Sequence, residues 1–172
     1  MQNPFEIFSL PISFNLDQDL LNERYLEQQK VLHPDNFVNA DPIAQCLAMQ
    51  RSADINDALQ QLKDPILRAE AIIALHLGEQ NLEQKSTQDV SFLIQQLQWR
   101  ETLEDIEQKR DEVALEEFSE QVKCETSRFL TALSASLESE KWKEAEQLCD
   151  KLRFIRKLTE QIGQVEEHLF SF

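Results

Sequence analysis

Glycine and proline are nearly absent from most of this chain, and their scarcity limits the folds that it can adopt. The 172 residues include two glycines, Gly78 and Gly163, and five prolines, the last of which is Pro65. Strands must be joined by turns, and turns recruit glycine, proline and asparagine. We therefore predict long helices after Pro65 and an all-α fold for the chain, in which hydrophobic residues, at 41% of the sequence, supply a core.

The N-terminal part of the sequence predicts a short apolar segment followed by a helical hairpin. Residues 4–10 are suited to one or two helical turns. Asp17 is a good N-cap or first-turn acid for a helix over residues 17–32, and a second helix is expected over residues 43–63. One side of this second helix is predicted to be buried, namely Leu47, Ile55, Ala58, Leu59 and Leu62.

The two helices of this hairpin are separated by the tripeptide His33-Pro34-Asp35. Proline cannot continue a helix, and it disfavours the helical conformation in the residue before it. The first helix is therefore expected to end here, with polar and rigid residues presented at its exit. Taken alone, the tripeptide favours a simple helix stop followed by a turn over a functional site.

After the hairpin, the sequence predicts one more helix, a linker and a three-helix bundle. Pro65 is well tolerated in the first turn of a helix over residues 66–77, and Gly78 is placed as its C-terminal stop. Apolar residues then recur at helical spacing, which indicates three amphipathic helices in an antiparallel bundle. We expect these helices over residues 88–107, 110–138 and 141–169, and domains over residues 1–76 and 88–172 joined by a linker over residues 77–87.

The first helix of the predicted bundle carries two apolar stripes instead of one. At about 100° per residue, one stripe contains Phe92, Trp99, Leu103 and Ile106. The other contains Val90, Leu93, Ile94 and Leu97, and Glu101, Glu104 and Asp105 continue it. A surface helix should carry one stripe, so the second is either buried against a neighbour or exposed as a docking patch. Phe154, at the flank of the last helix, either extends that patch or belongs to the core.

Charge and composition argue against several classes of function. A net charge of −15 disfavours nucleic acid and anionic membrane surfaces as partners. The sequence has no segment of transmembrane length, no secretory signal and no phosphate-binding glycine loop. Three scattered cysteines, of which we expect Cys46 to be a small core residue, suit a reducing compartment such as a bacterial cytoplasm. We expect no enzyme activity, no metal site and no cofactor.

Several segments together resemble the J-domain co-chaperones of the HscB family. The hairpin carries Tyr25, His33-Pro34-Asp35, Phe37 and Asn56 at matching places. Three later segments restrict the resemblance to this family: DPILRAEAIIALHL (residues 64–77), FLIQQLQWRETLEDIE (residues 92–107) and KLRFIRKL (residues 151–158). The resemblance covers nearly the whole chain. It implies an N-terminal J-domain and a C-terminal three-helix domain.

The resemblance also implies partners and sites. In this family the J-domain binds the DnaK-class chaperone HscA and stimulates its ATP hydrolysis, and the bundle binds the iron–sulfur scaffold IscU. The chaperone-binding residues would be Arg24, Lys30, His33, Pro34 and Asp35. The scaffold-binding residues would be Leu93, Ile94, Leu97, Glu101, Asp105 and Phe154, which largely coincide with the second stripe.

The sequence departs from general J-proteins in ways that keep other functions open. The helix before His33 has only Arg24 and Lys30 as cations, which favours a dedicated chaperone, and Gln28 and Asn36 stand where Leu and Lys are usual. A J-like adaptor that recruits another client or self-associates is the main alternative. A metal or cluster carrier is a third hypothesis, supported only by three cysteines and three histidines at unhelpful spacing.

Overall fold

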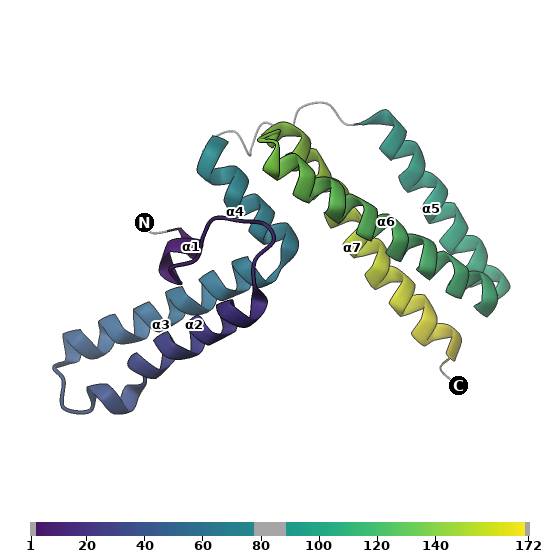
Figure 1. Cartoon of the computed structure of the whole chain (residues 1–172). Helices are drawn as coiled ribbons and strands as arrows, with labels where there is room; N and C mark the ends of the chain where they lie inside the picture. The colour runs from purple at the N-terminus through teal and green to yellow at the C-terminus, as the bar shows by residue number, and fades with distance from the viewer. Residues whose placement is uncertain (1–2, 78–88, 171–172) are drawn as a thin grey trace. The chain divides into compact units, whose positions relative to one another are not determined.

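The computed structural model describes residues 3–77 and 89–170, and these residues form helices and no strand (Figure 1). The predicted stop at Gly78 and all of the predicted linker except Leu77 lie outside the described residues. The chain divides into two compact units, Met1–His76 and Leu77–Phe172. The all-α class expected from the scarcity of glycine and proline is confirmed.

The N-terminal unit consists of a helical hairpin and three further helical elements. Its elements are α1 (Pro4–Ile7), α2 (Gln18–Val31), the 3-10 helix η1 (Pro34–Phe37), α3 (Pro42–Lys63) and α4 (Pro65–Leu77). Helices α2 and α3 run side by side, and η1 lies at the tip of the hairpin (Figure 1). The side chains that fill its core with no exposed surface are Phe5, Phe8, Leu21, Leu62, Ala69 and Ile73.

Local signals explain where these helices begin. The Asp17 side chain accepts hydrogen bonds from the backbone N–H groups of Asp19 and Leu20, so the predicted N-cap is confirmed. Asp41 caps α3 in the same manner through the N–H of Ala44, at 2.7 Å. Such caps satisfy N–H groups that the helix itself leaves without partners.

Two expectations for α3 and its surroundings are wrong. Leu47 is 51% exposed, because the neighbouring position Ala48 faces α2 and continues the buried row of Ile55, Ala58 and Leu62. Cys46 is exposed and is not a core residue. Near the tip of the hairpin, α3 packs only on α2 and η1, so a single row of its side chains is covered.

The C-terminal unit consists of α5 (Val90–Lys109), α6 (Glu112–Glu138) and α7 (Trp142–Phe170). Helices α6 and α7 form a long antiparallel pair, and α5 lies against both (Figure 1). The predicted three helices are confirmed within a few residues at each end. Their shared core comprises Trp99, Leu103, Ile106, Leu115, Phe118, Val122, Ile155, Leu158, Ile162 and Val165.

Two tight turns join these three helices without glycine. Arg110 and Glu140 adopt left-handed backbone conformations, with φ of 51° and 59°. A left-handed residue at the end of a helix lets the following N–H groups bond to the last carbonyls, and the N–H of Asp111 bonds to the Ile106 carbonyl at 3.2 Å. Glycine is the usual residue for this conformation, which is why the sequence marks these turns so weakly.

Candidate functional site

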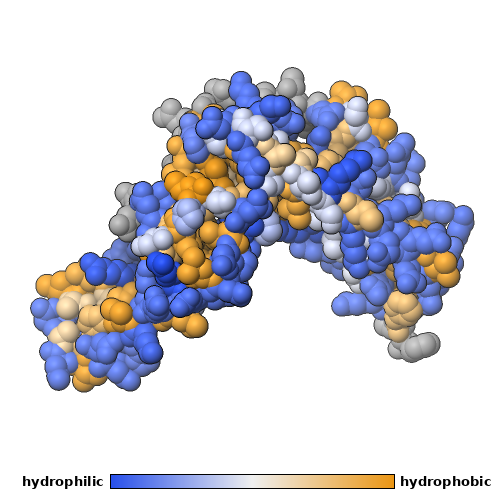
Figure 2. Space-filling model, viewed as in Figure 1, coloured by the Kyte–Doolittle hydropathy of each residue, from blue (hydrophilic) through white to orange (hydrophobic). Residues whose placement is uncertain are grey.

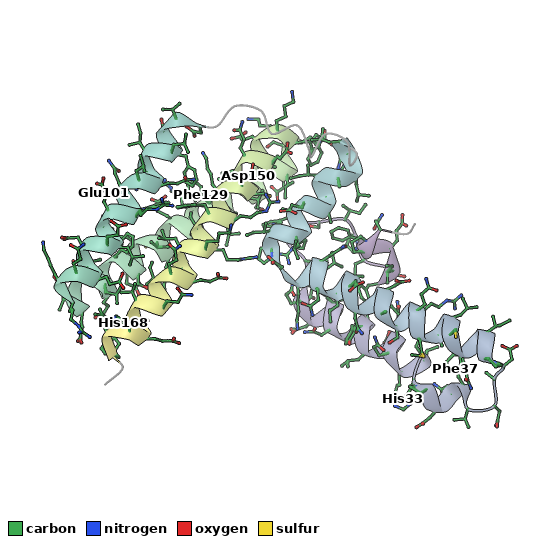
Figure 3. All side chains as sticks on the ribbon, turned by 180° about the vertical axis from the view of Figure 1, so that it is seen from behind. His33, Phe37, Glu101, Phe129, Asp150 and His168 are labelled. Carbon is green, nitrogen blue, oxygen red and sulfur yellow. The ribbon has the colours of Figure 1, made fainter. Side chains whose placement is uncertain are left out.

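The His33-Pro34-Asp35 loop is held at the end of α2 by its own side chains. His33 is the N-cap of η1, and its Nδ1 accepts a hydrogen bond from the Asp35 N–H at 3.2 Å. The same Nδ1 lies 3.4 Å from an Asp35 carboxylate oxygen, and the two side chains are 60% and 85% exposed. The loop therefore presents the Asp35 carboxylate to solvent in a fixed turn, at the end of the hairpin where Figure 3 labels His33 and Phe37.

Asn36 and Gln45 fix the backbone on either side of this loop. The Asn36 amide donates to the carbonyls of Lys30 and Val31, at 2.8 and 3.1 Å, and so satisfies the last turn of α2. The Gln45 amide donates to the Phe37 carbonyl at 2.9 Å and connects η1 to α3.

The two cations that the resemblance assigns to chaperone binding occupy different environments. Lys30 is exposed on α2, one turn before the loop. Arg24 is only half-exposed, and its Nη1 donates to the Phe8 carbonyl at 3.5 Å, toward the segment that follows α1. Lys30 therefore lies on the solvent side of α2, whereas Arg24 is directed toward the interior of the N-terminal unit.

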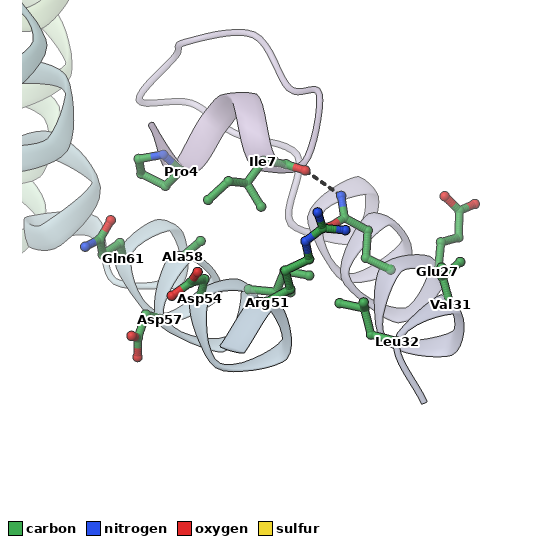
Figure 4. Close-up of a pocket in the computed structure, with 12 residues that line it drawn as sticks. Pro4, Ile7, Glu27, Val31, Leu32, Arg51, Asp54, Asp57, Ala58 and Gln61 are labelled. Atoms are coloured by element: carbon green, nitrogen blue, oxygen red, sulfur yellow. Dashed lines mark hydrogen bonds between the residues drawn. The ribbon is translucent and has the colours of Figure 1, made fainter. Parts of the chain in front are cut away.

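Gln28 replaces the expected apolar residue because it links α2 to α1. Its side-chain amide donates to the Ile7 carbonyl, as the dashed line in Figure 4 shows. The contact lies beside an open groove of about 880 Å³ between α1, α2 and α3. On the hairpin itself, Tyr25 donates to the Asn56 side chain at 2.7 Å, so α2 and α3 are also joined by polar contacts.

The second apolar stripe of α5 is exposed. Leu93, Ile94 and Leu97 are 37%, 52% and 59% exposed, whereas Trp99 and Leu103, on the opposite side of the helix, are buried. The second stripe is therefore not buried against a neighbouring helix, and its residues form an exposed patch. We call Leu93, Ile94 and Leu97 the α5 patch.

Acidic residues continue the α5 patch along the helix. Glu101 and Asp105 are exposed, one and two turns beyond Leu97, and Figure 3 shows Glu101 on the outer side of α5. Asp105 accepts a hydrogen bond from Lys109 at 3.1 Å within the same helix. Figure 2 shows that apolar side chains also reach the surface elsewhere, notably near the tip of the hairpin. In the α5 patch, three apolar residues share one helix face with the carboxylates of Glu101 and Asp105.

Phe154, the sixth predicted scaffold-binding residue, belongs to an aromatic cluster beneath this helix. Its ring stacks on Trp99 with centroids 6.2 Å apart and meets Phe92 edge-on at 5.8 Å. Phe154 is half-buried and comes from α7. It therefore lies at the border of core and surface, and not on the exposed face of α5.

Sequence reasoning missed one ion pair near this patch. Asp89, the N-cap of α5, lies 3.1 Å from the ammonium group of Lys151 on α7. The hydrogen bond from Lys151 lowers the pKa of the Asp89 carboxyl group below its ordinary value. Residues 62 positions apart carry no mutual spacing signal, so only the folded arrangement of α5 and α7 reveals their contact.

The described residues hold no group of three or more His, Cys, Asp or Glu side chains arranged for a metal ion. In the same part of the chain, no helix is long and apolar enough to cross a membrane. The candidate binding sites that the sequence predicted both lie on exposed surface, at the His33–Asp35 loop and at the α5 patch.

The three cysteines differ in burial, which predicts different reactivity. Burial, together with the nearby carboxylates of Asp150 and Glu146, raises the pKa of the Cys149 thiol to about 12. Because the thiolate is the reactive form, Cys149 should resist a disulfide reagent at about pH 8, while the exposed Cys46 and Cys124 react. We expect two labelled thiols in the native protein and three after denaturation, counted by mass spectrometry. Native labelling of Cys149 would contradict this.

Comparisons with known proteins agree on one family. The family model described as "HSCB C-terminal oligomerisation domain" matches residues 88–163. The chain is 61% identical to the co-chaperone protein HscB homolog of Haemophilus influenzae over 172 residues, which cover 99% of each chain. The chaperone HscB from Vibrio cholerae has a similar solved structure, with a TM-score of 0.86, 38% identity and coverage of 98% of this chain and 100% of that one.

A second solved structure extends the likeness beyond bacteria. Human co-chaperone protein HscB matches with a TM-score of 0.84 and 25% identity, over 96% of this chain and 83% of the human one. The resemblance found in the sequence is thus matched both by curated relatives and by solved structures. With 61% identity to a curated relative across almost the whole of both chains, the chain belongs to the HscB family of co-chaperones.

Proposed function

We propose that this protein stimulates ATP hydrolysis by the DnaK-class chaperone HscA and delivers the iron–sulfur scaffold IscU to it. Residues 1–76 would act as the J-domain, residues 77–87 as the linker and residues 88–172 as the scaffold-binding domain. The protein itself would hydrolyse nothing, and it would act in the bacterial cytoplasm. The observation that carries the proposal is that one chain presents both the exposed Asp35 loop and the exposed α5 patch.

The loop would act by contact with the chaperone and not by chemistry of its own. The turn fixed by His33 and Asn36 holds the Asp35 carboxylate where it can meet a cation on the chaperone. A binding partner shifts a conformational equilibrium only if it binds one state more tightly. The J-domain is therefore proposed to bind the hydrolysis-competent state of HscA in preference to the others.

The α5 patch would recruit the scaffold by burying apolar surface. Three exposed aliphatic side chains next to carboxylates suit a partner with an apolar patch and a cationic rim. Holding the scaffold in the same complex as the chaperone raises its effective concentration there. The two activities should therefore reinforce each other.

The proposal is tested by measuring steady-state ATP hydrolysis by HscA as this protein is titrated in, with and without IscU. We expect stimulation in both series, and stronger stimulation when IscU is present. If stimulation is the same with and without IscU, the proposed J-domain function stands, and the C-terminal unit would bind a different client. The absence of stimulation in both series would reject the co-chaperone activity with HscA.

Self-association through the C-terminal unit is a second candidate function. The description of the matching family model names oligomerisation, and an exposed apolar patch is a common feature of protein contacts. Sedimentation equilibrium over a range of protein concentrations tests it. A monomer throughout that range would exclude self-association as the role of the α5 patch.

A further inference from the structure

The start of α5 is joined to α7 by the side chain of Lys151. Its ammonium group is 3.1 Å from an Asp89 carboxylate oxygen, and the lysine and aspartate side chains are 22% and 46% exposed. Asp89 also accepts hydrogen bonds from the N–H groups of Ser91 and Phe92, at 3.0 and 3.4 Å. One carboxylate therefore caps α5 and binds α7 at the same time.

The same lysine lies over two aromatic rings. Its ammonium nitrogen is 5.6 Å from the ring centroid of Phe92 and 5.8 Å from that of Phe129, within the range of a cation–π contact. Phe92 belongs to α5 and Phe129 to α6, whereas Lys151 comes from α7. All three helices of the C-terminal unit therefore meet around this one cation.

The rings beneath Lys151 continue the connection toward the core. Phe92 meets Trp99, Phe129 and Phe154 edge-on, with centroids 6.1, 6.4 and 5.8 Å apart. The buried residues of α5 begin only at Trp99. The first two turns of α5 are thus held to α6 and α7 mainly by Phe92 and by the Asp89–Lys151 ion pair. We call this ion pair the α5 clip.

Two of the three residues of the α5 patch, Leu93 and Ile94, lie on those same two turns, and Leu97 begins the third. Leu93 and Ile94 directly follow Phe92, and successive helical residues are about 100° apart. A rotation or lifting of this end of α5 therefore changes the placement of Leu93 and Ile94 relative to Phe154, the one predicted scaffold contact on α7. Lys151 itself lies on the aromatic side of α5, and Leu97 lies on the opposite, exposed side.

We propose that Lys151 is a positioning residue for the α5 patch, which through the α5 clip and Phe92 holds the patch in the orientation that the scaffold binds. This inference rests on the proposed function, in which the patch is the scaffold-binding site. A patch fixed before binding loses less conformational freedom when the complex forms. The clip therefore contributes to affinity without touching the partner.

The test measures IscU affinity by calorimetry for Lys151→Gln and for Lys151→Arg. We expect the dissociation constant to rise about tenfold in Lys151→Gln, the size suited to the loss of one partly exposed ion pair and two cation–π contacts. Lys151→Arg should restore most of the affinity, because it keeps the charge and stacks on aromatic rings. Lys123→Gln, which breaks the exposed pair between Lys123 and Glu120, is the matched control for the change in net charge.

Hydrogen exchange supplies the readout that separates positioning from a general loss of stability. In Lys151→Gln, the amides after Phe92 in the first two turns of α5 should exchange faster, while those around Leu133 in α6 stay unchanged. Unchanged IscU affinity in Lys151→Gln would overturn the inference, whether or not exchange is faster. If instead replacing Leu93 and Leu97 leaves affinity unchanged, it is the proposed function that fails.

Discussion

Replacing Asp35 by alanine is expected to abolish stimulation of the chaperone ATPase and to leave the fold of the protein unchanged. The Asp35 side chain is 85% exposed, and its carboxylate lies 3.4 Å from Nδ1 of His33, which is itself exposed. Exposed substitutions away from caps and cores usually change the free energy of unfolding by no more than about 0.5 kcal/mol. Circular dichroism and the thermal midpoint should therefore match those of the unaltered protein.

The functional effect of Asp35→Ala should be large because a charged contact would be lost at an interface. Removing one partner of a buried charge pair between proteins typically costs about 2–5 kcal/mol. A loss of that size lowers binding by more than tenfold, and stimulation falls with it. The measurement is steady-state ATP hydrolysis by HscA at saturating ATP as the variant is titrated in.

A matched control separates the loop from general surface charge. Asp54 is an exposed aspartate on α3 of the same unit, so Asp54→Ala makes the same change in net charge outside the loop. Stimulation should survive in Asp54→Ala and disappear in Asp35→Ala. Full stimulation by Asp35→Ala would reject the chaperone contact at this loop.

Much of the helical framework could be predicted from the sequence, because it depends on local signals. Asp17 is followed by a helical pattern and caps α2 as expected, and four of the five prolines are the first residues of helical elements. Periodicity also separated the two faces of α5, with Trp99 buried and Leu97 exposed. These features follow from backbone hydrogen bonding and from a repeat of 3.6 residues.

The features that could not be predicted depend on which helices cover one another. Leu47 and Cys46 are apolar or small, but the end of α3 has too few neighbours to bury them. From the sequence, Arg24 is expected to be an accessible cation on α2. In the structure it donates to the backbone carbonyl of Phe8, which directly follows α1. The pairing of Asp89 with Lys151 depends on the packing of α5 on α7, which no local pattern specifies.

The second large effect is expected when Leu93 and Leu97 are both replaced by alanine. The two side chains are 37% and 59% exposed and share the face of α5 opposite its buried residues. If the scaffold covers them, the double variant removes two central apolar contacts, and such contacts commonly contribute about 1–2 kcal/mol each. The dissociation constant for IscU should then rise by roughly 30- to 1,000-fold.

Stability distinguishes a docking patch from a core. Leu→Ala at a fully buried position costs about 2–5 kcal/mol, whereas exposed positions usually change by about 0.5 kcal/mol or less. The double variant should therefore unfold near the denaturant midpoint of the unaltered protein, while Leu133→Ala, at a position with no exposed surface, should unfold much earlier. Val113→Ala, which trims an exposed side chain on α6, controls for the general loss of surface apolar area.

The two measurements together decide what the α5 patch does. Lost IscU affinity with an unchanged midpoint assigns Leu93 and Leu97 to the scaffold contact, because nothing else about the unit has changed. A lowered midpoint would instead mean that the leucines stabilise the fold, and any loss of affinity would follow from that. Unchanged affinity and an unchanged midpoint would leave the patch free for another partner, and self-association measured on the same variant would then test the second candidate function.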